Sequence, residues 1–230
     1  MKKVLVAALL SLCTVSVFAA WDKFPVIEDG KGEAKFEFYK SRQAYDPGMG
    51  FDFKIRYSPL AKLELMSVWD IESNYVLGAR YQVIPVLSAG VDIAFPIESP
   101  VWSFTPNIQF SMPLSEALVL GSNVEFTIPT EDSETEYKDF MSLVAGVELD
   151  VTLGQSTIWV GFDFETGIGE DSAKNKAGDS GRGAKMSPAI GYLAAVGNLT
   201  LGTSVALDFG EKSGNDPFNT TIGLDASIKF

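Results

Sequence analysis

TTIGLDASIKF, the stretch from Thr220 to Phe230, has a period of two and ends on an aromatic residue. One face of the stretch is apolar and consists of Ile222, Leu224, Ala226, Ile228 and Phe230. The opposite face is small or polar and consists of Thr221, Gly223, Asp225, Ser227 and Lys229. Because successive side chains of a β-strand point to opposite sides, this alternation predicts a strand with one apolar and one polar face.

An apolar terminal strand that ends in Phe resembles the closing strand of a Gram-negative outer-membrane β-barrel, where it serves as the assembly signal. The resemblance implies that the apolar face from Ile222 to Phe230 is the assembly strand. It also implies that the barrel-assembly machinery is a partner during insertion. A β-sandwich can end on Phe as well, so the interpretation depends on the rest of the chain.

The first twenty residues have the pattern of a secretory signal peptide. Lys2 and Lys3 precede an apolar run from Val4, and the small residue Ala19 marks the expected cleavage site. We therefore predict a cleaved signal peptide over residues 1–19, a periplasmic linker over 20–32 and a transmembrane barrel over 33–230. Cys13, the only cysteine of the chain, lies in the signal peptide, so the mature chain would have no thiol.

The charge balance excludes several classes of function. The chain carries a net charge of −12, and removal of Lys2 and Lys3 leaves 16 of its 18 basic residues against 30 acidic ones. Such an acidic chain is a poor partner for nucleic acid. The chain has no histidine, whereas outer-membrane proteases and phospholipases of similar architecture use histidine in their sites. We expect no enzyme, no cofactor and no metal site, although Asp163 and Glu165 leave a carboxylate site conceivable.

Eleven further segments between Ala34 and Phe209 alternate in the same way, which makes twelve in all. The most regular is the sixth, whose apolar face consists of Trp102, Phe104, Ile108, Phe110 and Met112. We predict an all-β fold, a single antiparallel transmembrane β-barrel of twelve strands in the cell outer membrane. A secreted soluble β-sandwich that acts as a binding module would also alternate, and it is the competing interpretation.

Three features favour the barrel over the sandwich. The links after even-numbered strands are short and most links after odd-numbered strands are longer, as expected for periplasmic turns and extracellular loops. Aromatic residues fall at strand ends, where two membrane interfaces would lie. Glycine recurs on the polar face, which suits a crowded lumen. Two prolines, Pro106 and Pro188, oppose the assignment, and a bulge or a later strand start would accommodate them.

The predicted polar faces give the lumen two differently charged sides. A basic arc on the first four strands and the last consists of Lys35, Lys54, Arg56, Lys62, Arg80 and Lys229. An acidic face on the fifth to eleventh strands, with no inward base among them, consists of Asp92, Glu125, Glu148, Asp150, Asp163, Glu165 and Asp208. Two aromatic residues, Tyr39 and Trp159, also point inward and could stack against a ring-shaped solute, although such residues more often fill volume.

Two functions fit this lumen. The first is a narrow passive channel for small solutes or cations, with an acidic outer vestibule and a basic arc near the periplasmic end. The second is a structural or adhesive barrel in which the charges pair and occlude the lumen. The expected surroundings are outer-membrane lipid and lipopolysaccharide, and the pattern does not indicate an oligomeric state. The acidic loop from Glu131 to Glu136 is expected to be solvated. The polar loop from Thr166 to Lys185 is expected to be mobile, and it could fold into the lumen or contact a partner.

Overall fold

The computed structural model describes residues 23, 27–42, 49–70, 74–96, 102–129, 141–168, 184–210 and 218–230. The predicted signal peptide, the acidic loop 131–136 and residues 169–183 of the polar loop lie outside the described residues. No helix in the described part of the chain is long and apolar enough to cross a membrane.

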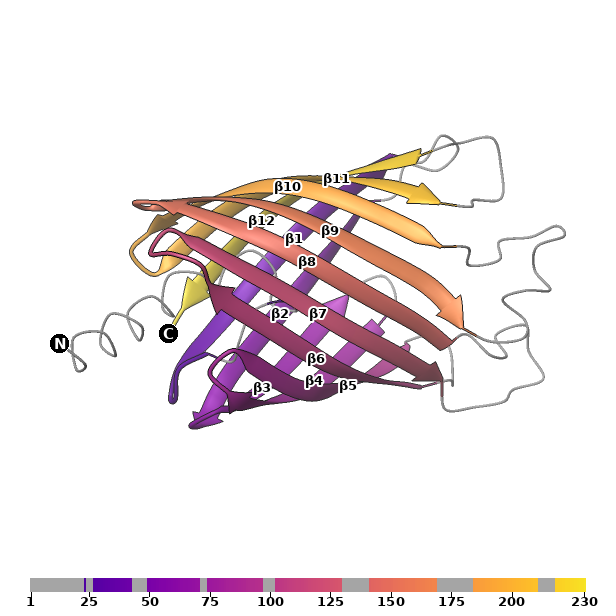
Figure 1. Ribbon diagram of the computed structural model, residues 1–230, viewed down its shortest axis with the longest axis horizontal. Helices are drawn as coiled ribbons and strands as arrows, with labels where there is room; N and C mark the ends of the chain where they lie inside the picture. The colour runs from indigo at the N-terminus through magenta and orange to yellow at the C-terminus, as the bar shows by residue number, and fades with distance from the viewer. Residues whose placement is uncertain are drawn as a thin grey trace, which may run out of the picture.

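The described residues form twelve antiparallel strands that close into one barrel (Figure 1). The strands are β1 Gly32–Arg42, β2 Met49–Leu60, β3 Leu63–Asp70, β4 Asn74–Ile84, β5 Leu87–Pro96, β6 Ser103–Pro113, β7 Leu118–Pro129, β8 Met141–Leu153, β9 Ser156–Ile168, β10 Lys185–Val196, β11 Leu199–Gly210 and β12 Phe218–Lys229. Each strand pairs with its neighbours in sequence, and β12 pairs with β1. The predicted number of strands and the antiparallel barrel are confirmed.

The terminal strand closes the barrel. Phe36 of β1 lies opposite Ala226 of β12, and Glu33 lies opposite Lys229. Beyond the end of β12, the backbone N–H of Phe230 donates to the carbonyl of Gly32 at 2.9 Å, and the N–H of Gly32 donates back at 2.9 Å. Closure pairs both edges of the described sheet, which is the condition for a sheet that lies in lipid.

The links after the even-numbered strands are tight turns at one end of the barrel (Figure 1). Three of these turns contain a residue with positive φ, namely Lys62 at 71°, Gly154 at 66° and Gly197 at 63°. Glycine adopts this conformation without steric cost, whereas lysine does so at some cost. The predicted short turns are confirmed. Most residues of the longer links after the odd-numbered strands lie outside the described part of the chain.

The barrel is polar inside and apolar outside, the reverse of a soluble protein. The largest fully buried side chains include Arg56, Arg80 and Gln109, whereas Leu224 is 53% exposed. Among the described residues, the buried apolar side chains are only Met66, Val119 and Leu193. A soluble sandwich buries its apolar faces between two sheets, so the competing sandwich interpretation is wrong.

Aromatic side chains gather on the exterior near the strand ends. Phe95 of β5 and Trp102, which precedes β6, meet edge to face with ring centroids 4.6 Å apart. Tyr75 lies 6.3 Å from Phe95 on the other side. Tyr81 and Phe230, assigned to the opposite end, are both about half exposed. Interfacial girdles of this kind are typical of membrane barrels.

Both prolines lie inside regular strands, so the expected bulge or late strand start is wrong. Pro106 of β6 pairs with Val91 of β5, and Pro188 of β10 pairs with Phe162 of β9. On its other side each proline interrupts the ladder without changing the register. Because proline lacks only the N–H donor, one strand can lose a bond on one side and keep its pairing on the other.

Candidate functional site

The interior wall of β1 to β5 is a ladder of ion pairs. Arg56 Nη2 lies 2.6 Å from Glu33 Oε2, and Arg56 Nη1 lies 3.6 Å from Glu64 Oε2. Glu64 also approaches Arg80 at 3.7 Å, and Arg80 reaches Asp92 at 3.6 Å. Each member of the ladder is an inward side chain on a neighbouring strand, so Arg56 and Arg80 of the basic arc pair with acids of the same wall.

Two lysines of the basic arc share one acid. Lys35 and Lys54 lie opposite each other in the β1–β2 register, where like charges repel. Glu37 relieves this repulsion, since its carboxylate lies 2.5 Å from Lys35 Nζ and also forms an ion pair with Lys54. Asp225 of β12 lies 4.0 Å from Lys35 Nζ.

The remaining two members of the predicted basic arc, Lys62 and Lys229, lie at or next to the ends of strands. Lys62 is exposed in the turn between β2 and β3, so its predicted place on an inward strand face is wrong. Its positive φ places it in the turn instead of the strand. Lys229 is half-buried on β12, opposite Glu33 of β1.

The predicted acidic residues of β7 to β9 form a separate wall. Asn123, Gly146 and Asp163 lie side by side in register across β7, β8 and β9. Glu148 and Asp150 continue the inward face of β8 and are almost completely buried. Asn123 Nδ2 donates to Glu125 Oε1 at 2.8 Å.

A lysine from outside the barrel strands reaches this acidic wall. Lys23 Nζ lies 2.7 Å from Asp163 Oδ1, and the Lys23 side chain is buried. Further along the same segment, the backbone N–H of Ile27 donates to Glu64 Oε2 at 3.2 Å. The segment before β1, predicted as a periplasmic linker, therefore places at least Lys23 within the lumen.

The expectation of no inward base from the fifth to the eleventh strand is also wrong. Lys185, the first residue of β10, lies 3.4 Å from Asp208 Oδ1 of β11. Ser187 Oγ donates to the same oxygen at 2.6 Å. Glu165 lies opposite Lys185 in the β9–β10 register. The inward position of Lys185 was not predicted, because Lys185 lies at the end of a glycine-rich, charged loop where polar and apolar residues do not alternate.

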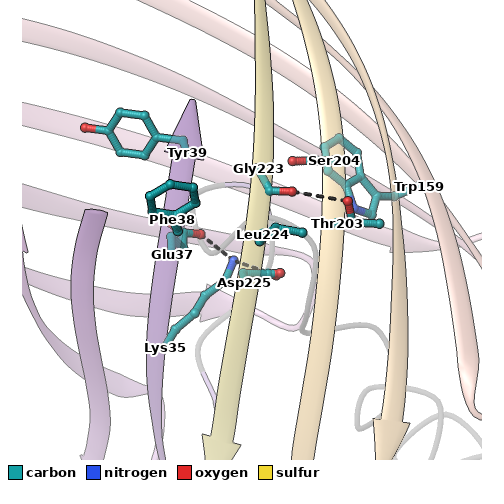
Figure 2. Close-up of a pocket in the computed structure, with 10 residues that line it drawn as sticks. All are labelled: Lys35, Glu37, Phe38, Tyr39, Trp159, Thr203, Ser204, Gly223, Leu224 and Asp225. Carbon is teal, nitrogen blue, oxygen red and sulfur yellow. Dashed lines mark hydrogen bonds and ion pairs between the residues drawn. The ribbon is translucent and has the colours of Figure 1, made fainter. Parts of the chain in front are cut away.

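The two inward aromatic residues line one pocket of the lumen. The pocket has a volume of about 230 Å³ and lies between β1, β9, β11 and β12. Figure 2 shows Tyr39 and Trp159 on opposite sides of it, with Lys35, Glu37 and Asp225 forming a charged group below them. The structure thus brings together the predicted aromatic pair and part of the predicted basic arc.

Glycines provide the space in which both aromatic rings lie. A Cβ at Gly50 would collide with the Tyr39 ring, and a Cβ at Gly191 would collide with the Trp159 indole. Each ring therefore lies against a neighbouring strand that has no side chain at that level.

The substitution Gly191→Ala is expected to destabilise the barrel by about 1–3 kcal/mol, because the added methyl group overpacks the Trp159 indole. Denaturant unfolding followed by tryptophan fluorescence measures the change. The control is Gly161→Ala, since a Cβ there meets its nearest neighbour at an ordinary 3.4 Å. Equal effects of the two substitutions would contradict the packing of Trp159 on Gly191.

Comparison with solved structures places this architecture among porins. The chain is similar to the NanC porin, with a TM-score of 0.62 and 8% identity over 86% of this chain and 100% of that one. It is similar to the KdgM porin, with a TM-score of 0.56 and 12% identity over 85% and 99% of the two chains. The CymD monoaromatic hydrocarbon channel gives a TM-score of 0.50 and 9% identity over 96% and 91%. A search of curated proteins found no match.

A closed barrel with an apolar exterior and a charged lumen is an outer-membrane β-barrel of the porin type. A closed antiparallel barrel with an apolar exterior is located in the cell outer membrane. The chain belongs to the family described as "Putative MetA-pathway of phenol degradation", whose model matches residues 73–222.

Proposed function

We propose that the protein is a narrow passive channel for small solutes or cations. The observation that carries the proposal is the open pocket of about 230 Å³ inside a lumen lined by charged and polar side chains. A barrel closed for purely structural reasons would fill this volume with side chains. The ion-pair ladder on one wall and the acidic residues on the other give the passage an electrostatic asymmetry.

A single-ring solute fits this pocket best. Tyr39 and Trp159 offer two aromatic faces, and a pocket of this size holds about one small ring. The description of the family refers to phenol degradation, and CymD is described as a monoaromatic hydrocarbon channel. Both favour a small aromatic solute over a sugar or a nucleoside.

The ion-pair ladder supports a second candidate, a structural or adhesive barrel with an occluded lumen. Arg56, Arg80 and Lys23 each contact inward acids and narrow the passage. In either case we propose that the exposed face of β12, from Ile222 to Phe230, faces lipid and guides insertion by the barrel-assembly machinery. Lipopolysaccharide is the expected neighbour of the outer end.

Planar-bilayer recordings test conduction. The wild-type barrel is expected to give discrete openings that prefer cations, and the double variant Glu125→Gln/Asp163→Asn is expected to bring the K⁺ to Cl⁻ permeability ratio toward one. Asp208→Asn is the control for the removal of an ion-paired acid, because Asp208 contacts Lys185 as Asp163 contacts Lys23. It is expected to change the permeability ratio less than the double variant, which also removes Glu125. A silent barrel that still shows the heat-dependent gel shift of a folded barrel would support the occluded alternative.

The same recordings test the class of solute. Phenol added to the bath is expected to reduce the current through the wild-type channel, and Trp159→Ala is expected to weaken this block. Cyclohexanol, a ring of similar size without a π-face, is the control compound. Equal block by phenol and cyclohexanol would contradict recognition by stacking.

A further inference from the structure

The acidic wall of β7 to β9 contains a buried amide oxygen for which the described residues provide no hydrogen-bond partner. This atom is Oδ1 of Asn123, a residue that is only 5% exposed. Glu148 and Asp150, which are 2% and 1% exposed, lie further along the same wall, and their carboxyl groups interact with each other. A buried acceptor without a partner is costly, and beside an inward carboxylate it indicates a place that takes up a donor.

Gly146 of β8 lies at the centre of this wall, and the side chains of Asn123, Asp163 and Lys23 surround the position of its missing Cβ. A Cβ at Gly146 would collide with Asp163 Oδ1 and would come within 2.5 Å of Asn123 Oδ1 and of Lys23 Cε. The missing side chain therefore makes a cradle, bounded by a carboxylate oxygen and an amide oxygen. A methylene group lies in that cradle, next to the ammonium group that binds Asp163 at 2.7 Å.

We propose that this cradle, formed by Asn123, Gly146 and Asp163, is a binding site for primary alkylammonium groups. Lys23 is its intramolecular ligand. The ammonium has three N–H donors for carboxylate and amide acceptors, and the alkyl stem fits over a residue that has no Cβ. The described residues contain no group of three acids, histidines or cysteines placed to hold a metal ion.

The acidic wall that carries the cradle continues to the lumen pocket, since Asp150 of β8 lies opposite Trp159 of β9 and Trp159 lines that pocket. A free amine that reaches the cradle is expected to compete with Lys23 for Asp163. The inference concerns binding alone and does not require conduction, so it can fail or hold independently of the proposed channel.

Isothermal titration calorimetry with n-butylammonium chloride, which reproduces the lysine side chain, tests the site on the folded mature barrel in detergent micelles. The Lys23→Gln variant is expected to bind n-butylammonium about tenfold more tightly than the wild type, because the tethered ammonium no longer competes. Tetramethylammonium, which has the same charge and no N–H donor, is expected to bind weakly to both proteins.

Two glycine variants in the Lys23→Gln background separate a shaped site from diffuse negative charge. Gly146→Ala keeps every carboxylate but fills the cradle, and it is expected to abolish the binding of n-butylammonium. Gly161→Ala, on the adjacent strand with ordinary space for a methyl group, is expected to retain it. A heat-dependent gel shift confirms that each variant is folded. Where Gly146→Ala does not fold, Asp163→Asn replaces it and is expected to weaken binding at least severalfold.

Three results would overturn the proposal. The first is equal affinity of the wild type and Lys23→Gln for n-butylammonium. The second is full binding by a folded Gly146→Ala or Asp163→Asn variant in the Lys23→Gln background. The third is tetramethylammonium binding as tight as that of n-butylammonium, which would indicate attraction by net charge alone.

Discussion

Replacement of Arg56 by methionine is expected to lower the free energy of unfolding by about 3–5 kcal/mol, because removal of one partner of a buried ion pair leaves uncompensated charge. The Arg56 side chain is completely buried, between Glu33 at 2.6 Å and Glu64 at 3.6 Å. Without the guanidinium group, both carboxylates remain in a lumen wall that excludes water. Equilibrium unfolding in guanidinium chloride from lipid vesicles, followed by tryptophan fluorescence, measures the loss.

Two further variants show whether burial is the cause. Lys185→Met breaks a pair whose lysine side chain is 43% exposed, and it is expected to cost at most about 1 kcal/mol. The double variant Arg56→Met/Glu33→Gln removes both members of the close pair and leaves Glu64 with Arg80, and it is expected to recover much of the stability that Arg56→Met loses. If Arg56→Met costs no more than Lys185→Met, the ladder is solvated and does not stabilise the barrel.

The second large effect is expected on the outer surface. Leu224→Arg places a charge at the middle of β12, on a face that is exposed in the isolated chain and covered by lipid in the membrane. The expected cost is about 2–4 kcal/mol, the range for a basic residue near the bilayer midplane of a barrel. The measurement is the same unfolding experiment from vesicles.

The matched control for Leu224→Arg is Leu153→Arg. Leu153 is the last residue of β8, next to the turn at Gly154, and it is also exposed. Near the interface the expected cost is only about 0–1 kcal/mol. A cost that does not depend on depth would mean that the apolar band is not embedded in lipid.

The division into an apolar exterior and a polar lumen follows from the sequence alone. A period of two is a local property of the chain, so Leu224, Ile108 and Val147 can be assigned to the lipid face without knowing their neighbours. The strand number and the short turns follow from the same pattern, because each turn interrupts the alternation. Arg56, Arg80 and Glu148, which the same pattern assigns to the lumen, are buried side chains. Lys62, assigned to the start of a strand, lies in a turn instead.

Only the tertiary structure decides which of these inward side chains meet. The pairing of Arg56 with Glu33 depends on the β1–β2 register, and the common pocket of Tyr39 and Trp159 depends on the closure of β1 against β12. Lys23 lies about 140 positions before its partner Asp163 and belongs to no alternating segment. Their contact therefore cannot be predicted from the alternation of the sequence. Contacts across a lumen are set by strand tilt, stagger and closure, which are properties of the whole sheet. That is why the charge of the lumen could be predicted and its ammonium cradle could not.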